Sequence, residues 1–216
     1  MVLFNQMKEF NDRKDAGKQL AKRIETLMDG MNPRKTLVLG LTRGGVPVAK
    51  EIADYFNLPL DVLIVRKIGA PLNSEYAIAA VSQHELVIGD HEFANYVKEQ
   101  VEHERFEIKR RLAYYRDEKP PLLLKGKIVI LVDDGLATGL SMGVALRELA
   151  RLKPEKIIIA IPVAASDSLG LLVREGHPVI ALRVTKNFSS VGNFYKVFNQ
   201  ITDEEVRSSL PLAKHK

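Results

Sequence analysis

The sequence predicts an α/β fold built on a parallel sheet of about five strands flanked by helices, and three observations support this prediction. Short apolar runs rich in β-branched residues alternate with amphipathic helical patterns along most of the chain. Each run ends in a turn that leads into a helix, as in successive βαβ units with right-handed crossovers. The chain has 216 residues, of which 46% are hydrophobic, enough for one domain with a full core.

The first part of the chain is predicted to form one βαβ unit. Residues 12–29 have the spacing of an amphipathic helix, and 36–41 form an apolar run typical of a buried strand. A turn at 42–45 leads into a helix. The next strand is predicted over 61–66, which completes the unit.

Residues 67–93 interrupt this alternation and are predicted to be a loop followed by two short strands, at 77–82 and 85–88. Residues 94–116 carry an apolar stripe at helical spacing within a highly charged segment. We therefore expect 67–119 to be an inserted flap and long helix.

The α/β pattern then resumes, with strands predicted over 128–133, 156–163 and 178–184 and helices over 140–152 and 166–175. A short helix is predicted after Thr202, because Thr202-x-x-Glu205 matches a capping box. We expect one domain over 1–216, with its core in 12–66 and 120–184 and a small C-terminal hood over 185–216.

Composition narrows the chemistry that the protein can perform. The net charge of +5 suits an anionic small-molecule substrate and also permits nucleic-acid binding. The absence of cysteine excludes disulfides, thiolate catalysis and sulfur-ligated metals. The longest apolar stretch, 157–165, is too short to cross a bilayer, and charged residues precede any long apolar run at the N-terminus. We therefore expect a cytoplasmic protein with no leader peptide and no membrane partner.

The segment 129–141 joins an apolar strand to two adjacent carboxylates, a turn and a helix. Asp133 and Asp134 can hydrogen-bond a ribose diol or hold Mg²⁺ through water and substrate oxygens. The following turn would direct backbone N–H groups at a phosphate monoester, and it consists of Gly135, Leu136, Ala137, Thr138 and Gly139. The alternative is ordinary Asp-Gly turn chemistry after a strand.

Two further anion-binding elements are expected at the same edge of the sheet. In the turn Thr42-Arg43-Gly44-Gly45, the glycines let the backbone approach an anion closely and adopt positive φ, and Arg43 offers a fork of donors. Arg66-Lys67, at the end of the next predicted strand, adds two cations. The alternatives are a plain strand-to-helix turn and a solvated pair of surface cations.

The segment 129–141 resembles the phosphoribosyl pyrophosphate (PRPP) signature of type I phosphoribosyltransferases. Asp-Asp-Gly-Leu-Ala-Thr-Gly at 133–139 is similar to the motif of the adenine branch, and Arg-Lys-Ile-Gly-Ala-Pro at 66–71 is similar to that branch's Arg-Lys-x-Gly-x-x-Pro. The turn at 42–45 is similar to the family's pyrophosphate loop. The start and tail of the chain resemble a group of predicted phosphoribosyltransferases whose acceptor is not assigned.

The resemblance implies a Rossmann-like type I phosphoribosyltransferase fold, a homodimer, and Mg²⁺-dependent displacement of pyrophosphate from PRPP by a nitrogenous acceptor, with a purine-like base favoured. It implies that residues 133–139 bind PRPP and that Asp133 and Asp134 also hold Mg²⁺. The implied pyrophosphate-binding residues are Thr42, Arg43, Gly44, Gly45, Arg66 and Lys67. The implied catalytic residues are Arg66, Lys67, Asp133 and Asp134.

The residues that would identify the acceptor differ from the family's patterns. Ala137 stands where the branches acting on 6-oxo purines carry an Asp, and Ala79-Ala80 replaces the Glu-Tyr of the adenine branch. Glu75 and His84 remain as acid–base candidates in the flap. The alternative function is a PRPP-sensing regulator of the same fold that binds nucleic acid, although no nucleic-acid module is recognised and this partner is not expected.

The C-terminal segment concentrates aromatic residues, which allows two interpretations: Phe188, Phe194, Tyr195 and Phe198. They either form a small core of their own or place an aromatic face over the acceptor. The second interpretation predicts that Val163 and Phe188 contact the acceptor.

Overall fold

The computed structural model describes residues 9–117 and 119–211, except for the side chains of Ser74 and Glu75. Its centre is a five-stranded sheet in the order β2-β1-β6-β7-β8, and a second sheet has the order β3-β4-β5. All four pairings in the central sheet are parallel. The predicted α/β architecture around a five-stranded parallel sheet is therefore confirmed.

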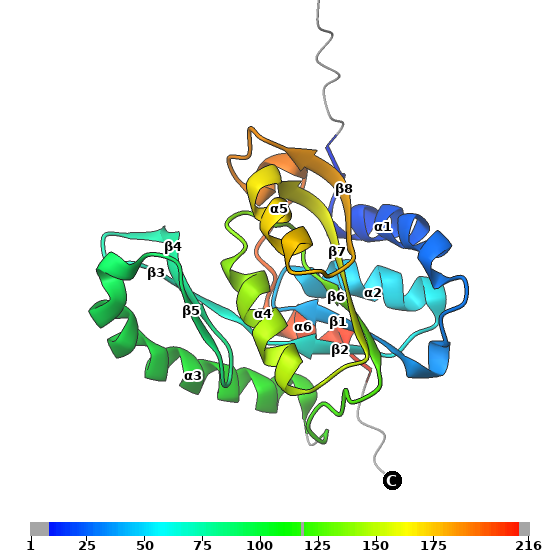
Figure 1. Cartoon of the computed structure of the whole chain (residues 1–216), viewed down its shortest axis with the longest axis horizontal. Helices are drawn as coiled ribbons and strands as arrows, with labels where there is room; N and C mark the ends of the chain where they lie inside the picture. The colour runs from blue at the N-terminus through cyan, green and yellow to red at the C-terminus, as the bar shows by residue number, and fades with distance from the viewer. Residues whose placement is uncertain (1–8, 118, 212–216) are drawn as a thin grey trace, which may run out of the picture.

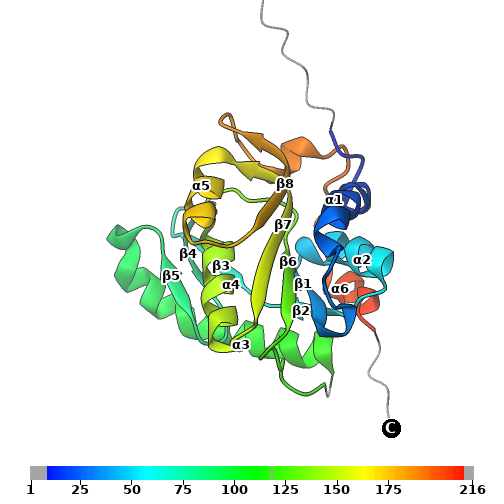
Figure 2. The ribbon, with the colours of Figure 1, turned by 45° about the vertical axis from the view of Figure 1, so that its right-hand side comes forward.

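The central strands are β1 (Thr36–Leu41), β2 (Leu60–Leu63), β6 (Ile128–Val132), β7 (Lys156–Ala165) and β8 (Val179–Thr185). The helices around them are α1 (Arg13–Met28), α2 (Gly45–Phe56), α4 (Leu140–Arg151), α5 (Ser166–Arg174) and α6 (Asp203–Ser209). Seen along the sheet, α1, α2 and α6 cover one face, and α4 and α5 cover the other (Figure 2).

Three further strands and one α-helix extend from one side of this three-layer body (Figure 1). They are β3 (Arg66–Ala70), β4 (Asn73–Val81), β5 (Leu86–Ile88) and α3 (Ala94–Arg116). The longest of the described helices is α3, with 23 residues, and it is strongly charged. Among the residues that the structure describes, no helix is both long enough and apolar enough to cross a membrane.

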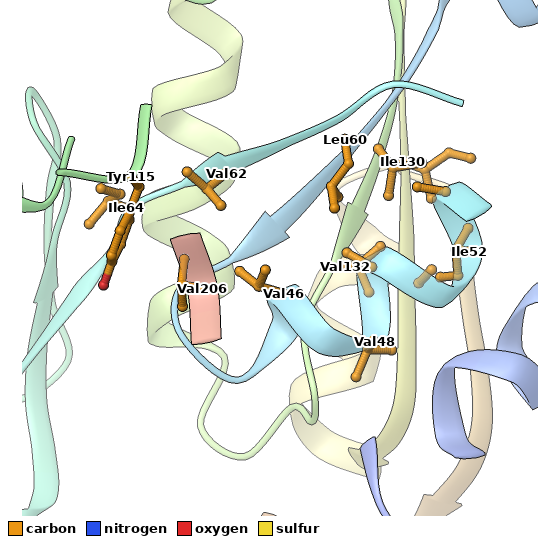
Figure 3. Packing of buried hydrophobic residues seen from close by; sticks show 14 of the residues in the cluster. Val46, Val48, Ile52, Leu60, Val62, Ile64, Tyr115, Ile130, Val132 and Val206 are labelled. Atoms are coloured by element: carbon orange, nitrogen blue, oxygen red, sulfur yellow. The ribbon is translucent and has the colours of Figure 1, made fainter. Parts of the chain in front are cut away.

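The central strand β6 is buried along its whole length, as expected for a parallel strand covered on both faces. Ile130 and Val132 point toward Val46 and Ile52 of α2, and Val206 of α6 joins the same cluster (Figure 3). The strand therefore ends at a rigid position, and the residues that follow Val132 are held there by the core.

The predicted C-terminal boundary of the strand over 61–66 is wrong. The strand β2 stops at Leu63, and Arg66 begins β3, which pairs antiparallel with β4. Burial of Ile68 and Ala70 depends on that hairpin and on α3, so the charged and glycine-containing sequence of β3 shows no strand pattern by itself. Arg66 and Lys67 consequently belong to the flap rather than to the central sheet.

Buried ion pairing attaches α3 to the edge strand β2. The Arg116 guanidinium donates to both carboxylate oxygens of Asp61, with Nε 3.0 Å from Oδ1 and Nη2 3.1 Å from Oδ2. Nη2 also donates to the Pro120 carbonyl at 2.7 Å. Both charged side chains are almost fully buried, so this pair fixes the C-terminal end of α3 against the sheet.

The start of the described chain meets the segment that follows β8. Phe10 N donates to the Phe194 carbonyl at 2.8 Å, and Lys196 N donates to the Phe10 carbonyl at 2.8 Å. Further along, the predicted capping box is present, with Thr202 and Glu205 each accepting from the other's backbone N–H. These contacts place the tail close to the N-terminus of α1.

Candidate active site

Two adjacent carboxylates stand at the end of the central strand. Asp133 and Asp134 directly follow β6, and Asp134 N donates to Asp133 Oδ1 at 2.9 Å. Burial, followed by the neighbouring charge of Asp134, raises the pKa of Asp133, while the positive charges of Lys67 and Arg13 oppose this shift. The buried Asp133 carboxyl therefore favours its neutral form more strongly than a solvated Asp does.

Arg13, at the start of α1, binds the second carboxylate. Its Nε donates to Asp134 Oδ2 at 2.8 Å, its Nη1 donates to the Asn199 carbonyl at 2.8 Å, and its guanidinium lies 3.8 Å from the centre of the Phe198 ring. Tyr195 Oη also donates to the backbone oxygen of Asp134 at 2.6 Å. Arg13 is absent from the predicted site, because no local pattern links residues separated by 121 positions.

The turn before α2 packs directly on the acidic pair. A Cβ on Gly44 would lie 1.9 Å from Asp134 Oδ2, and one on Gly45 would lie 2.5 Å from the Val132 carbonyl oxygen. The expectation of positive φ is wrong, since Gly44 has a φ of −61° and Gly45 already starts the helix. The glycines are needed for close approach: only a hydrogen fits between this turn and the carboxylates.

The same turn contains two further features at its start. The peptide bond between Thr42 and Arg43 is cis. Among the described residues, Thr42 Oγ1 is buried and has no hydrogen-bond partner. A bound anion or its water could therefore meet an unused polar group here.

The turn after the acidic pair is attached to the neighbouring strand and helix. Leu136 N donates to the Val163 carbonyl at 2.8 Å, and Ser168 Oγ donates to the Ala137 carbonyl at 2.5 Å. Gly139 adopts a φ of +81° and immediately precedes α4. The predicted phosphate turn thus lies at a helix N-terminus, where backbone N–H groups and the helix dipole favour an anion.

The two cations of the flap face different partners. Arg66 Nε donates to Glu104 Oε2 of α3 at 2.5 Å. Lys67 is exposed, and its charge acts on the Asp133 carboxylate. Neighbouring residues in a strand point to opposite faces. Arg66 therefore pairs with α3, whereas Lys67 acts on the acidic pair.

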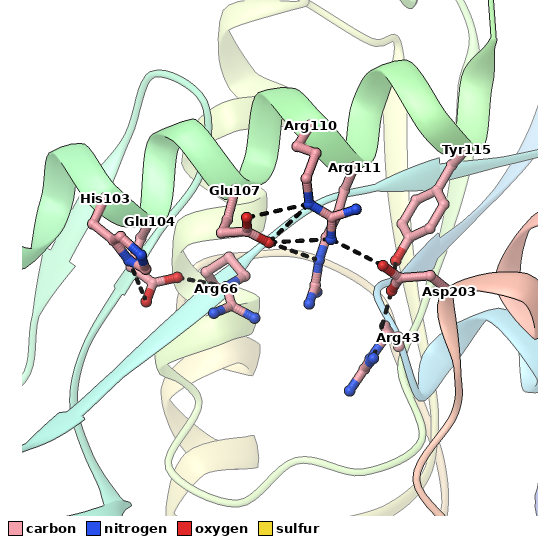
Figure 4. Close-up of polar contacts among 9 residues, drawn as sticks. All are labelled: Arg43, Arg66, His103, Glu104, Glu107, Arg110, Arg111, Tyr115 and Asp203. Atoms are coloured by element: carbon pink, nitrogen blue, oxygen red, sulfur yellow. Dashed lines mark hydrogen bonds and ion pairs between the residues drawn. The ribbon is translucent and has the colours of Figure 1, made fainter.

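Asp203, at the start of α6, joins the turn before α2 to α3 (Figure 4). Its carboxylate accepts from Tyr115 Oη at 2.6 Å and from Arg110 Nη2 at 3.0 Å, and Arg43 Nη1 lies 3.5 Å away. Although burial alone would raise it, the hydrogen bonds from Tyr115 and Arg110 lower the pKa of Asp203 to about 2. The carboxylate therefore remains charged and compensates part of the positive charge around it.

This lowered pKa predicts a specific pH dependence of stability. Asp203 stabilises the fold above its ordinary pKa of 3.8, and that contribution is lost as the pH falls toward about 2. Asp203→Asn should therefore reduce the free energy of unfolding at pH 7 by about 1 kcal/mol, with a smaller difference from the wild type at pH 3. Urea unfolding at the two pH values measures this, and an equal difference at both pH values would contradict it.

The aromatic tail forms a small core of its own. Phe188 and Phe194 stack with ring centres 5.3 Å apart, and Tyr195 packs on Phe10 with Val163 beneath. Val163 is fully buried, so its side chain offers no surface to an acceptor in this arrangement. Contact between Phe188, which is partly exposed, and an acceptor stays a prediction.

The structure separates the flap's acid–base candidates from the acidic pair. His84 Nδ1 lies 2.7 Å from Glu148 Oε1, near the C-terminal end of α4. With Glu148, His84 lines a cavity of about 530 Å³ beneath α3, whose lining does not include Asp133 or Asp134. The side chain of Glu75 lies outside the described residues.

Comparisons with known proteins extend over most of the chain. The family model described as phosphoribosyl transferase domain matches residues 6–177. Proteins named "Putative phosphoribosyl transferase" from two Mycobacterium tuberculosis strains are 35% identical over 214 residues, which cover 96% of this chain and 47% of theirs. This chain therefore spans about half the length of those curated relatives.

Solved structures also match most of the chain. The crystal structure of TT1426 from Thermus thermophilus is 38% identical, with a TM-score of 0.75, and the match covers 94% of this chain and 97% of that one. The AQ2163 protein from Aquifex aeolicus is 17% identical with a TM-score of 0.53, over 83% of this chain and 78% of that one. The second match concerns the fold alone.

Proposed function

Because the chain belongs to the phosphoribosyl transferase domain family, we propose that it is a Mg²⁺-dependent enzyme that displaces pyrophosphate from PRPP with a nitrogenous, purine-like acceptor. The observation that carries this proposal is the meeting of three elements at one edge of the sheet. The acidic pair follows β6, the glycine turn packs against it, and the phosphate turn leads from it into α4.

The donor set fits a magnesium ion that arrives with its ligand. Among residues 9–117 and 119–211, no group of three or more His, Asp and Glu residues could hold a metal ion. Mg²⁺ is commonly bound by one or two carboxylates together with substrate oxygens and water. Burial, and then the neighbouring charge of Asp134, raise the pKa of Asp133, so a cation bound beside the pair would favour the charged form of both carboxylates. Asp133 and Asp134 would hold the ion, which would stabilise charge on the leaving pyrophosphate.

The chain's own residues supply positioning and electrostatics. The reaction breaks the bond between ribose C1 and the pyrophosphate oxygen and forms a bond from C1 to the acceptor nitrogen, whose proton leaves to the departing pyrophosphate or to solvent. Positive charge develops on the ribose as the first bond breaks. The acidic pair would orient the ribose hydroxyls, and the turn 135–139 would bind the 5′-phosphate. Arg43 and Lys67 would stabilise the departing pyrophosphate.

The test is pyrophosphate release from PRPP and Mg²⁺ across purines, pyrimidines and other nitrogen acceptors, with PRPP binding measured separately by calorimetry. The double variant Asp133→Asn/Asp134→Asn should reduce release roughly 100-fold, because the ribose is no longer oriented. If the wild type fails to bind PRPP, the proposal is wrong. Binding without release for any acceptor would instead indicate a PRPP-sensing protein, and nucleic-acid binding would then be assayed.

A further inference from the structure

Arg111 is a buried arginine whose surroundings leave part of its guanidinium unused. It lies on α3, its side chain is 9% exposed, and among the described residues its Nε has no hydrogen-bond partner. The carboxylate of Glu107, one turn earlier, is 3.9 Å from Nε, beyond hydrogen-bond distance. A buried donor without a partner is unfavourable unless a ligand completes it.

Two further arginines are close enough to Arg111 for their positive charges to act on it. Burial, and then the positive charges of Arg66 and Arg43, lower the pKa of Arg111, whereas Tyr115 and Asp203 oppose this effect. Figure 4 shows the guanidinium groups of Arg43, Arg66 and Arg111 on the same side of α3. We call these three residues the arginine cluster; they come from the turn before α2, from β3 and from α3.

The described carboxylates near the cluster do not accept hydrogen bonds from all of its guanidinium N–H groups. Glu104 engages Arg66 through Nε, and Asp203 lies 3.5 Å from Arg43 while it also accepts from Tyr115 and Arg110. Glu107 hydrogen-bonds Arg110 rather than Arg111. A structural arginine would be expected to find a carboxylate at hydrogen-bond distance, and Arg111 has none among the described residues.

A phosphate group would supply the hydrogen-bond acceptors and the negative charge that the arginine cluster lacks. Guanidinium groups bind phosphate oxygens through paired N–H donors, and three of them on the same side of α3 (Figure 4) favour a multiply charged anion over a monoanion. The turn that carries Arg43 also packs on the acidic pair, so this turn connects the cluster to the proposed ribose site. The terminal phosphate of a sugar 1-diphosphate matches both the charge and the position.

We propose that Arg111 binds the terminal phosphate of the PRPP diphosphate, together with Arg43 and Arg66. This inference rests on the proposed function, and it adds to that site a residue from α3. The sequence gives no indication of this role, because Arg111 lies in a segment with many other charged residues, a pattern typical of a solvated helix face.

The experiment is calorimetric titration of the full chain with inorganic pyrophosphate and, separately, with ribose 5-phosphate. Arg111→Gln should weaken pyrophosphate binding by at least about tenfold and leave ribose 5-phosphate binding unchanged, since the lost contacts are charge-assisted hydrogen bonds to the diphosphate. The matched control is Lys109→Gln, which removes the same charge from an exposed position on the same helix and should leave both affinities unchanged.

The outcomes separate this inference from the proposed function. A wild type that binds neither PRPP nor pyrophosphate would overturn the function itself. A wild type that binds both, with an Arg111→Gln variant of equal pyrophosphate affinity, would overturn only the role of Arg111. If Arg111→Gln does not fold, Arg111→Lys keeps the charge but not the fork of donors. It should lose at least about threefold in pyrophosphate affinity, and unchanged affinity would overturn the inference.

Discussion

Gly44→Ala is expected to lower pyrophosphate release by about 1,000-fold, the largest loss of activity that we predict for a single substitution. The added methyl group would lie 1.9 Å from Asp134 Oδ2, so either the turn or the carboxylate must move. Either movement separates groups that must act on the ribose and the diphosphate together. Release of pyrophosphate, with PRPP binding measured in parallel, tests the prediction.

Gly143→Ala is the matched control for this substitution. Gly143 lies within α4, and a Cβ there would meet nothing within 4 Å. Alanine in a helix interior is favoured over glycine by about 0.5–1 kcal/mol, so this variant should be as active as the wild type and slightly more stable. A fully active Gly44→Ala variant with an unchanged circular dichroism spectrum would show that close packing of the turn is not required.

Asp61→Ala is expected to have the largest effect on stability, about 3–5 kcal/mol in the free energy of unfolding. It leaves the buried Arg116 guanidinium without its carboxylate and detaches the end of α3 from β2. Urea unfolding at pH 7 measures the loss. Because α3 carries Arg111, weaker pyrophosphate binding should accompany it.

Two control variants test whether the unpaired Arg116 causes the loss of stability. Asp54→Ala removes an exposed carboxylate that pairs with Lys50 at 2.8 Å, and it should cost less than about 1 kcal/mol. The double variant Asp61→Ala/Arg116→Met removes both buried charges and should recover much of the stability. If the double variant is no more stable than Asp61→Ala, the unpaired arginine is not the source of the effect.

The central sheet was predictable because parallel strands buried on both faces need continuous apolar runs. The predicted strand over 36–41 coincides with β1, and the predicted helix over 94–116 coincides with α3. The flap strand β3 was not predictable, since Arg66-Lys67-Ile68-Gly69-Ala70 becomes a strand through its pairing with β4. Tertiary context, rather than local preference, determines that segment.

The candidate site was predictable where its residues are neighbours in sequence. Asp133, Asp134 and the following turn form one continuous motif, and its position at the end of β6 follows from the strand before it. Arg13 and Arg111 were not predictable, because their contacts arise from folding between distant segments. Gly44 and Gly45 are an intermediate case. Close approach of the backbone was predicted, and the structure shows it toward the acidic pair; the predicted positive φ is wrong.

The contact of Arg13 with both Asp134 and Asn199 has a consequence for biosynthesis. Arg13 and Asn199 are separated by 186 positions, so the ribosome must translate nearly the whole described chain before the two can meet. The central strands can form earlier, but the arrangement around Asp134 cannot close until the tail has left the exit tunnel. A nascent chain halted before residue 199 should therefore fail to retain PRPP, even if its sheet has already formed.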